Sequence, residues 1–232
     1  VNKAAFNNPE LVNGLQLYFL TQLQMILDAA DYFESSVILF SERQTPRILG
    51  RLYSSVNSEL KKYYNFIDAR NSLIQSAFGS PQEFKKIVFD TIDMAAEKAL
   101  YWFDLAVRLL PGTWNRYPDW ENVYLEYMTS IETVGRSLAE KSRLLLSVAE
   151  RHVWAAENMG PDSPSDTLQY AIAWGNNYLS GEELNEYRLK LREIYAGVVE
   201  MNRELIKNGD SIPETRKEKI NTLIGLYESL QM

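Results

Sequence analysis

The sequence predicts an all-α protein, an elongated bundle of about seven helices with no significant β-structure. Nearly all of the eight prolines lie where a helix would begin or end. Between them, apolar residues recur at spacings of three and four, which is the period of a helix. The alternation typical of a strand is almost absent. Only residues 36–40 have a β-like composition, and we assign them to a helix or a break.

The N-terminal helices are predicted over residues 9–110. Asn8-Pro9-Glu10 opens the first and Thr45-Pro46 the second, and residues 80–83 open the third with the Ser and Glu spacing of a capping box. The second helix shows the apolar period most clearly, at Leu49, Leu52, Val56, Leu60, Tyr63, Ile67 and Ile74.

One long helix is predicted over residues 118–159, because Pro118 opens it and the apolar period then continues. At 1.5 Å per residue it would be about 63 Å long. C-terminal helices follow over residues 166–231, with further starts near Gly181 and Pro213. Since the linkers are short, we expect residues 1–232 to form a single all-helical domain.

Composition narrows the classes of partner. Acidic residues outnumber basic ones by 31 to 24, and the net charge of -7 argues against binding to nucleic acid. The chain has no cysteine, which excludes disulfides and thiolate metal sites. Residues 11–27 carry no charge, but they are too few and too polar to span a membrane, so we expect a buried helix there. We expect a cytoplasmic protein without a membrane span.

Two strings of carboxylates could hold a magnesium ion, because their spacing places each string on one helical face. They are Asp28, Asp31 and Glu34, and Asp90, Asp93, Glu97 and Asp104. The second string lies opposite the apolar face of its helix. Lys86 stands four positions before Asp90 and Arg108 four positions after Asp104, the spacing of surface ion pairs. We therefore expect both strings to face solvent, and we expect neither a metal site nor a cofactor.

The single histidine, His152, falls on the apolar face of its helix, among Leu145, Val148, Ala149 and Ala156. An inward histidine can transfer protons or line a pocket, but a lone one more often forms a hydrogen bond within the core. We favour the structural role and keep the pocket as the alternative.

Aromatic residues concentrate between residues 101 and 127. Within the connection at 111–117, Trp114, Arg116 and Tyr117 are candidate partner-binding residues, because Trp, Tyr and Arg are enriched at binding hot spots. The alternative is that this connection folds back and caps the end of the bundle.

Residues 143–151 resemble the Leu-Leu-Ser-Val-Ala helix of 14-3-3 phosphopeptide adaptors, which are also acidic and all-helical. The segment comes later in this chain than in that family, and we carry over no residue's role. A phosphopeptide groove would require arginines on a concave face; Arg43, Arg47 and Arg51 share one stretch.

These observations favour a non-enzymatic protein-protein interaction or assembly module, that is, a structural or scaffold protein without common catalytic motifs. The alternative is a small-molecule-binding or enzymatic bundle with a pocket at His152. We also expect a homo-oligomer, formed through the long helix or the C-terminal hairpin. The long helix would overhang its neighbours and leave Leu138, Leu145 and Val148 to be covered by a second subunit.

Overall fold

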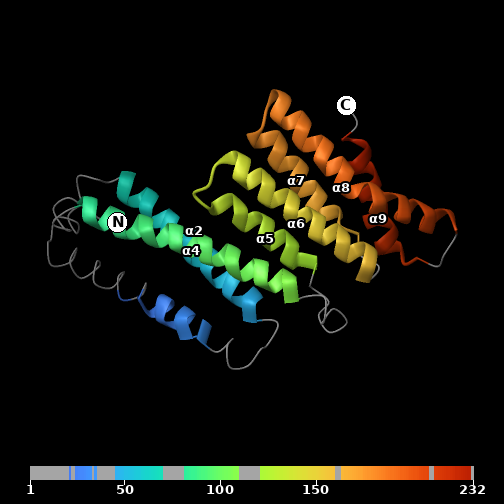
Figure 1. The fold of residues 1–232 in the computed structure, drawn as a ribbon. Helices are drawn as coiled ribbons and strands as arrows, with labels where there is room; N and C mark the ends of the chain where they lie inside the picture. The colour runs from blue at the N-terminus through green and yellow to red at the C-terminus, as the bar shows by residue number, and fades with distance from the viewer. Residues whose placement is uncertain are drawn as a thin grey trace. The chain divides into compact units, whose positions relative to one another are not determined.

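The structure is a computed structural model, and it describes residues 21, 24–32, 34, 35, 45–69, 81–109, 121–159, 163–208 and 212–230. The all-α prediction is confirmed over these residues, which form helices joined by turns and include no strand (Figure 1). None of the described helices is both long enough and apolar enough to cross a membrane. Residues 36–40, which we assign to a helix or a break, lie outside the described residues.

Contacts divide the chain into two compact units, residues 1–102 and 103–232. The division falls within helix α4 (Pro81–Leu109), so each unit contains part of that helix. The single domain that the sequence predicts stays a prediction.

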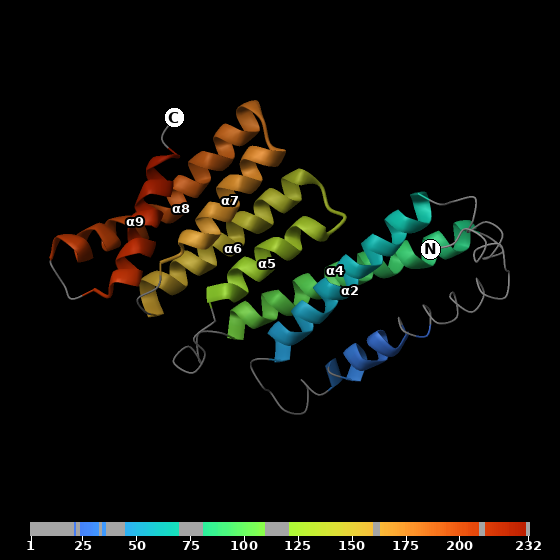
Figure 2. The ribbon, with the colours of Figure 1, turned by 180° about the vertical axis from the view of Figure 1, so that it is seen from behind.

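In the first unit, α2 (Thr45–Ala69) lies beside the part of α4 that precedes residue 103 (Figures 1 and 2). The predicted apolar face of α2 is confirmed where its side chains are described, since Leu49, Val56 and Leu60 are buried. Between the two helices, the Asn57 side chain donates a hydrogen bond of 2.8 Å to the backbone oxygen of Ile92. Apolar burial and one buried polar contact therefore join the pair.

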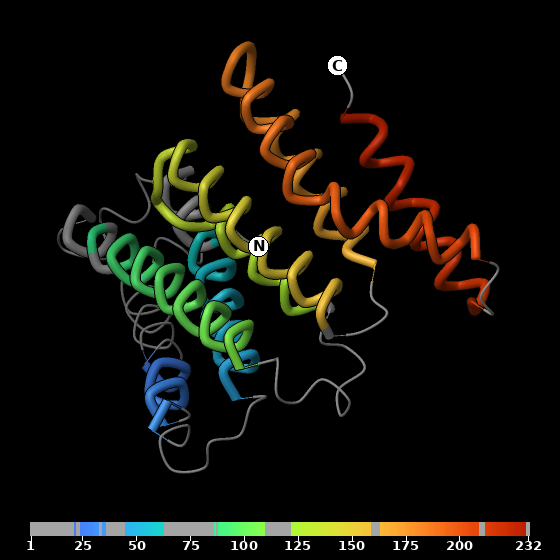
Figure 3. The backbone as a smooth tube through the Cα atoms, turned by 45° about the vertical axis from the view of Figure 1, so that its right-hand side comes forward, coloured from blue at the N-terminus to red at the C-terminus, as the bar shows by residue number. Residues whose placement is uncertain are grey.

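The second unit contains the end of α4 and five further helices: α5 (Glu121–Thr133), α6 (Leu138–Met159), α7 (Ser165–Tyr178), α8 (Gly181–Lys207) and α9 (Glu214–Glu228). Helix α6 packs on α5, α7 and α8, and α9 packs on α7 and α8. Figure 3 shows the chain reversing between α7 and α8 and again between α8 and α9. Helix α6 contacts three other helices, and it has both buried side chains, such as Leu145, and exposed ones, such as Trp154.

The prediction of one long helix over residues 118–159 is wrong. The chain leaves the helix after Thr133 and begins α6 at Leu138. Ser137 and Glu140 form a capping box: the Ser137 amide donates to Glu140 Oε2 at 3.1 Å, and the Glu140 amide donates to Ser137 Oγ at 3.3 Å. Gly135 precedes this box, at a point where a helix commonly ends. Both signals are present in the sequence, but the continuing apolar period hides them.

The break also removes the predicted overhang. Helix α6 has 22 residues, about 33 Å at 1.5 Å per residue. Leu145 and Val148, which were expected to need a second subunit, are buried within this chain. Leu138 remains 44% exposed. A homo-oligomer is therefore no longer required to cover this helix.

Several predicted helix starts are confirmed, since α2 begins at Thr45, α4 at Pro81 and α9 at Glu214. Ser180 and Glu183 have the spacing of a capping box. Helix α8 begins at Gly181, but Ser180 makes no side-chain capping bond, so the box does not form. The expected C-terminal hairpin is confirmed, since α8 packs on α9, and α8 also packs on α6 and α7.

Candidate functional site

The predicted partner-binding residues Trp114, Arg116 and Tyr117 lie outside the described residues, as does Arg43. Their role therefore stays a prediction. His152 is described, and its surroundings lead to the candidate site.

His152 lies inside the second unit, where four helices meet. It comes from α6, is 2% exposed, and stacks on Tyr124 of α5 with ring centroids 4.3 Å apart and planes 6° apart. Its Nδ1 lies 2.9 Å from the hydroxyl oxygen of Thr167 in α7, and that oxygen lies 3.0 Å from the hydroxyl of Tyr195 in α8. The predicted inward position of His152 therefore agrees with its burial.

The number of protons at Thr167 limits the hydrogen-bond roles in this network. The Thr167 hydroxyl has one proton, and it donates this proton to the backbone oxygen of Pro164 at 3.1 Å. Its oxygen can then accept from both other neighbours, from an Nδ1–H of His152 and from the Tyr195 hydroxyl. Burial raises the pKa of Tyr195 above its ordinary value, which keeps this donor protonated. This arrangement supports the structural role that the sequence favours.

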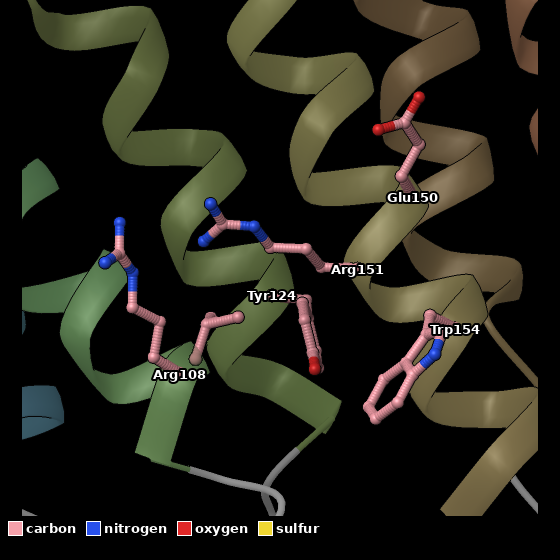
Figure 4. Close-up of a pocket in the computed structure, with 6 residues that line it drawn as sticks. Arg108, Tyr124, Glu150, Arg151 and Trp154 are labelled. Atoms are coloured by element: carbon pink, nitrogen blue, oxygen red, sulfur yellow. The ribbon is translucent and has the colours of Figure 1, made fainter.

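A surface hollow of about 420 Å³ lies next to this network and shares Tyr124 with it. Its lining residues come from the end of α4, from α5 and from α6: Val107, Arg108, Tyr124, Glu150, Arg151 and Trp154 (Figure 4). Trp154 is 53% exposed, whereas Tyr124 is buried and connects the hollow to His152 through ring stacking. The hollow thus combines an exposed indole with two guanidinium groups.

The two arginines share one carboxylate. Arg108 Nη2 lies 2.7 Å from Asp104 Oδ2, and Arg151 Nη1 lies 2.5 Å from Asp104 Oδ1. The Tyr127 hydroxyl also reaches Oδ1, at 3.4 Å, and its burial together with the Asp104 charge raises the pKa of Tyr127 to about 12. Asp104 therefore places Arg151 of α6 beside Arg108 of α4.

Sequence reasoning found only part of this cluster. It predicted the pair of Asp104 and Arg108 along one helix, but it expected Asp104 to face solvent and did not consider Arg151. It also did not single out Trp154. The available signal was that Trp154 stands off the predicted apolar face of its helix, where a tryptophan is costly to leave in water.

A second polar cluster surrounds Glu34 in the first unit. Glu34 Oε1 accepts hydrogen bonds from the Tyr53 hydroxyl at 2.6 Å, from Lys98 Nζ at 2.9 Å and from Trp102 Nε1 at 3.2 Å. The expectation that Glu34 faces solvent is therefore wrong, because donors from α2 and α4 converge on its carboxylate. This cluster joins helical elements, and we assign it a structural role.

The other members of the acidic strings behave largely as expected. Asp28, Asp31, Asp90 and Asp93 are exposed, and Glu97 is partly exposed. Within the part of the chain that the structure describes, no group of three or more His, Asp or Glu side chains could hold a metal ion.

Comparison of the chain with protein-family models, with curated proteins and with solved structures found no match. The site's own geometry therefore carries the functional argument.

Proposed function

We propose that this protein is a non-enzymatic helical protein-protein interaction or assembly module, and that the hollow beside Trp154 is its contact surface. The observation that supports this is the exposure of Trp154, 53%, next to Tyr124 and two arginines. Tryptophan, tyrosine and arginine are the residue types that contribute most at protein interfaces, because they combine a large contact area with polar groups. A partner side chain that enters the hollow would remove the indole from water.

A peptide-display selection on the full chain tests this proposal. Twelve-residue random peptides are selected on the wild-type protein, and their binding is then measured on Trp154→Ala. Tyr32→Ala is the matched control, because Tyr32 is 82% exposed and lies in the other unit. We expect selected peptides to lose binding on Trp154→Ala and to keep it on the control. Failure to enrich any peptide that depends on Trp154 would refute the proposal.

Self-association is one form that the interaction can take, and a homo-oligomer remains part of the proposal. Two apolar side chains of α6, Leu138 and Trp154, are exposed and would be available to a second copy. Sedimentation velocity at tens of micromolar is the test. We expect an oligomer that dissociates in Trp154→Ala, and a monomer at all concentrations would restrict the module to other partners.

A small-molecule-binding or enzymatic role is the second candidate. The hollow's volume, about 420 Å³, lies within the range of ligand pockets. Its Tyr124 wall also stacks directly on His152. A fragment screen by NMR distinguishes the candidates, since a ligand in the hollow would shift the resonances of Trp154 and His152. No such fragment is expected under the first proposal.

We also propose a cytoplasmic location, which rests on the composition of residues 11–27. Fractionation of cells that express the tagged chain would check it.

A further inference from the structure

The two sides of the hollow differ in charge. Arg108 and Arg151 supply two positive charges, and Asp104 and Glu150 supply two negative charges, so these four groups sum to zero, whereas the whole chain has -7. Glu150 also lines the hollow, but its carboxylate points away from both guanidinium groups (Figure 4). The side of the hollow at Arg108 is therefore the positive side.

The contacts with Asp104 leave the arginines with capacity to bind. Each oxygen of Asp104 contacts a different arginine, and each contact uses one guanidinium nitrogen. A guanidinium has five N–H donors, so neither arginine is saturated by Asp104. The Arg108 side chain is 65% exposed, and Arg151 is 37% exposed. Water can reach both groups, and so can the carboxylate of a partner.

The opposite side of the hollow is formed by Trp154, with Glu150 four positions earlier on the same helix (Figure 4). Trp154 presents its ring to the hollow, and Tyr124 lies between it and Arg108 (Figure 4). A ligand that fits both sides needs a large apolar group next to a negative charge. In a polypeptide, an aromatic or long aliphatic residue near Asp or Glu meets this requirement.

We propose that the hollow binds an acidic peptide segment of a partner protein, an inference that rests on the proposed function. The apolar side chain of the segment packs on Trp154, and a neighbouring carboxylate pairs with Arg108 and Arg151. Nucleic acid has a similar combination of rings and negative charge, but a chain with a net charge of -7 disfavours a phosphate backbone. A short acidic peptide, unlike a nucleic acid, can place its negative charge at the arginines alone.

Sequencing the peptides selected on the full chain provides the first test. At about 0.15 M salt, where exposed charges are screened beyond roughly 8 Å, we expect Asp or Glu within three positions of an aromatic or long aliphatic residue. For the best peptide, Trp154→Ala should weaken Kd about 30-fold, the loss typical of a hot spot. Arg108→Gln should weaken it about 5- to 10-fold, because one charge-assisted contact is lost.

Further variants show whether the charge of Arg108 causes the expected loss of peptide affinity. Arg203→Gln is the control, because Arg203 is likewise ion-paired, in its case with Glu200 and Glu228, but does not line the hollow. It should change Kd less than about twofold, the effect expected of a surface pair outside the interface. Arg108→Lys should restore part of the affinity. Replacing the peptide's acidic residue by its amide should weaken binding to wild type and cause a smaller loss on Arg108→Gln, where only Arg151 still pairs with the carboxylate.

The outcomes separate this inference from the proposed function. Peptides that depend on Trp154 but are basic or uncharged would overturn the acidic-peptide inference and leave the interaction module standing. Peptides that ignore Trp154, or no enrichment at all, would overturn both. An oligonucleotide that displaces the selected peptides from the hollow would also overturn the inference. Circular dichroism and thermal unfolding of each variant confirm that the affinities compare folded proteins.

Discussion

Replacing Glu34 by glutamine should destabilise the protein by about 1–2 kcal/mol. Three donors, from Tyr53, Lys98 and Trp102, converge on one carboxylate oxygen of Glu34. A hydrogen bond to a charged group contributes about 1 kcal/mol more than a neutral one, and glutamine keeps a neutral acceptor, so three bonds lose about 3 kcal/mol. We halve this figure, because the Lys98 side chain is 34% exposed and water screens the pair.

The loss of stability in Glu34→Gln should depend on pH. Burial alone would raise the pKa of Glu34, but hydrogen bonds from Tyr53, Lys98 and Trp102 outweigh it and hold the pKa below its ordinary value of 4.5. A carboxyl with a lowered pKa in the folded state stabilises that state above its unfolded pKa. The stabilisation is lost as the pH falls through the folded pKa. The difference between wild type and Glu34→Gln should therefore be full at pH 7 and shrink below 4.5.

Urea unfolding followed by circular dichroism at pH 7 and at pH 3.5 measures both effects. Glu59→Gln is the control, because Glu59 pairs with Lys62 on the same helix and both side chains are exposed. Its free energy of unfolding should change by less than about 0.5 kcal/mol. An equal loss for Glu34→Gln at both pH values would refute the electrostatic reasoning, and no loss at pH 7 would show that the cluster is not stabilising.

Three further changes test local packing and capping by urea unfolding. Ser137→Ala should lower the free energy of unfolding by about 1 kcal/mol, because Ser137 caps α6 through the Glu140 amide; an unchanged value would show that the cap does not stabilise α6. Gly175→Ala should be destabilising by about 1–2 kcal/mol, since its new Cβ would lie 2.8 Å from the buried ring of Tyr187. Gly225→Ala should instead stabilise the protein by about 0.5–1 kcal/mol, because nothing lies within 4 Å of its Cβ position in α9. Equal effects at the two glycines would contradict the packing argument.

The sequence predicts the structure correctly where the determinants are local. The starts of α2 at Thr45, α4 at Pro81 and α9 at Glu214 follow from a proline or a capping residue next to an apolar period. The inward position of His152 follows from its helical phase. Each of these depends on residues within one or two turns, so a single sequence contains the necessary information.

The sequence does not predict contacts between residues that are far apart in the chain. Glu34 and Lys98 are 64 positions apart, and Asp104 and Arg151 are 47 apart. Helical phase places each residue on a face, but it does not state which helix packs on that face or in which register. Carboxylates assigned to solvent can therefore acquire partners from another helix, and Asp104 gains the arginine that completes the candidate site.

The missed helix break has the largest consequence for function. Tyr124 and His152 are 28 positions apart, and one continuous helix would separate them by about 42 Å. The turn after Thr133 instead folds α6 back along α5, so that the two rings stack 4.3 Å apart. The same reversal brings Arg151 to Asp104 and sets Trp154 beside Tyr124. A continuous helix would keep these residues apart, and the hollow that carries the proposed function would not form.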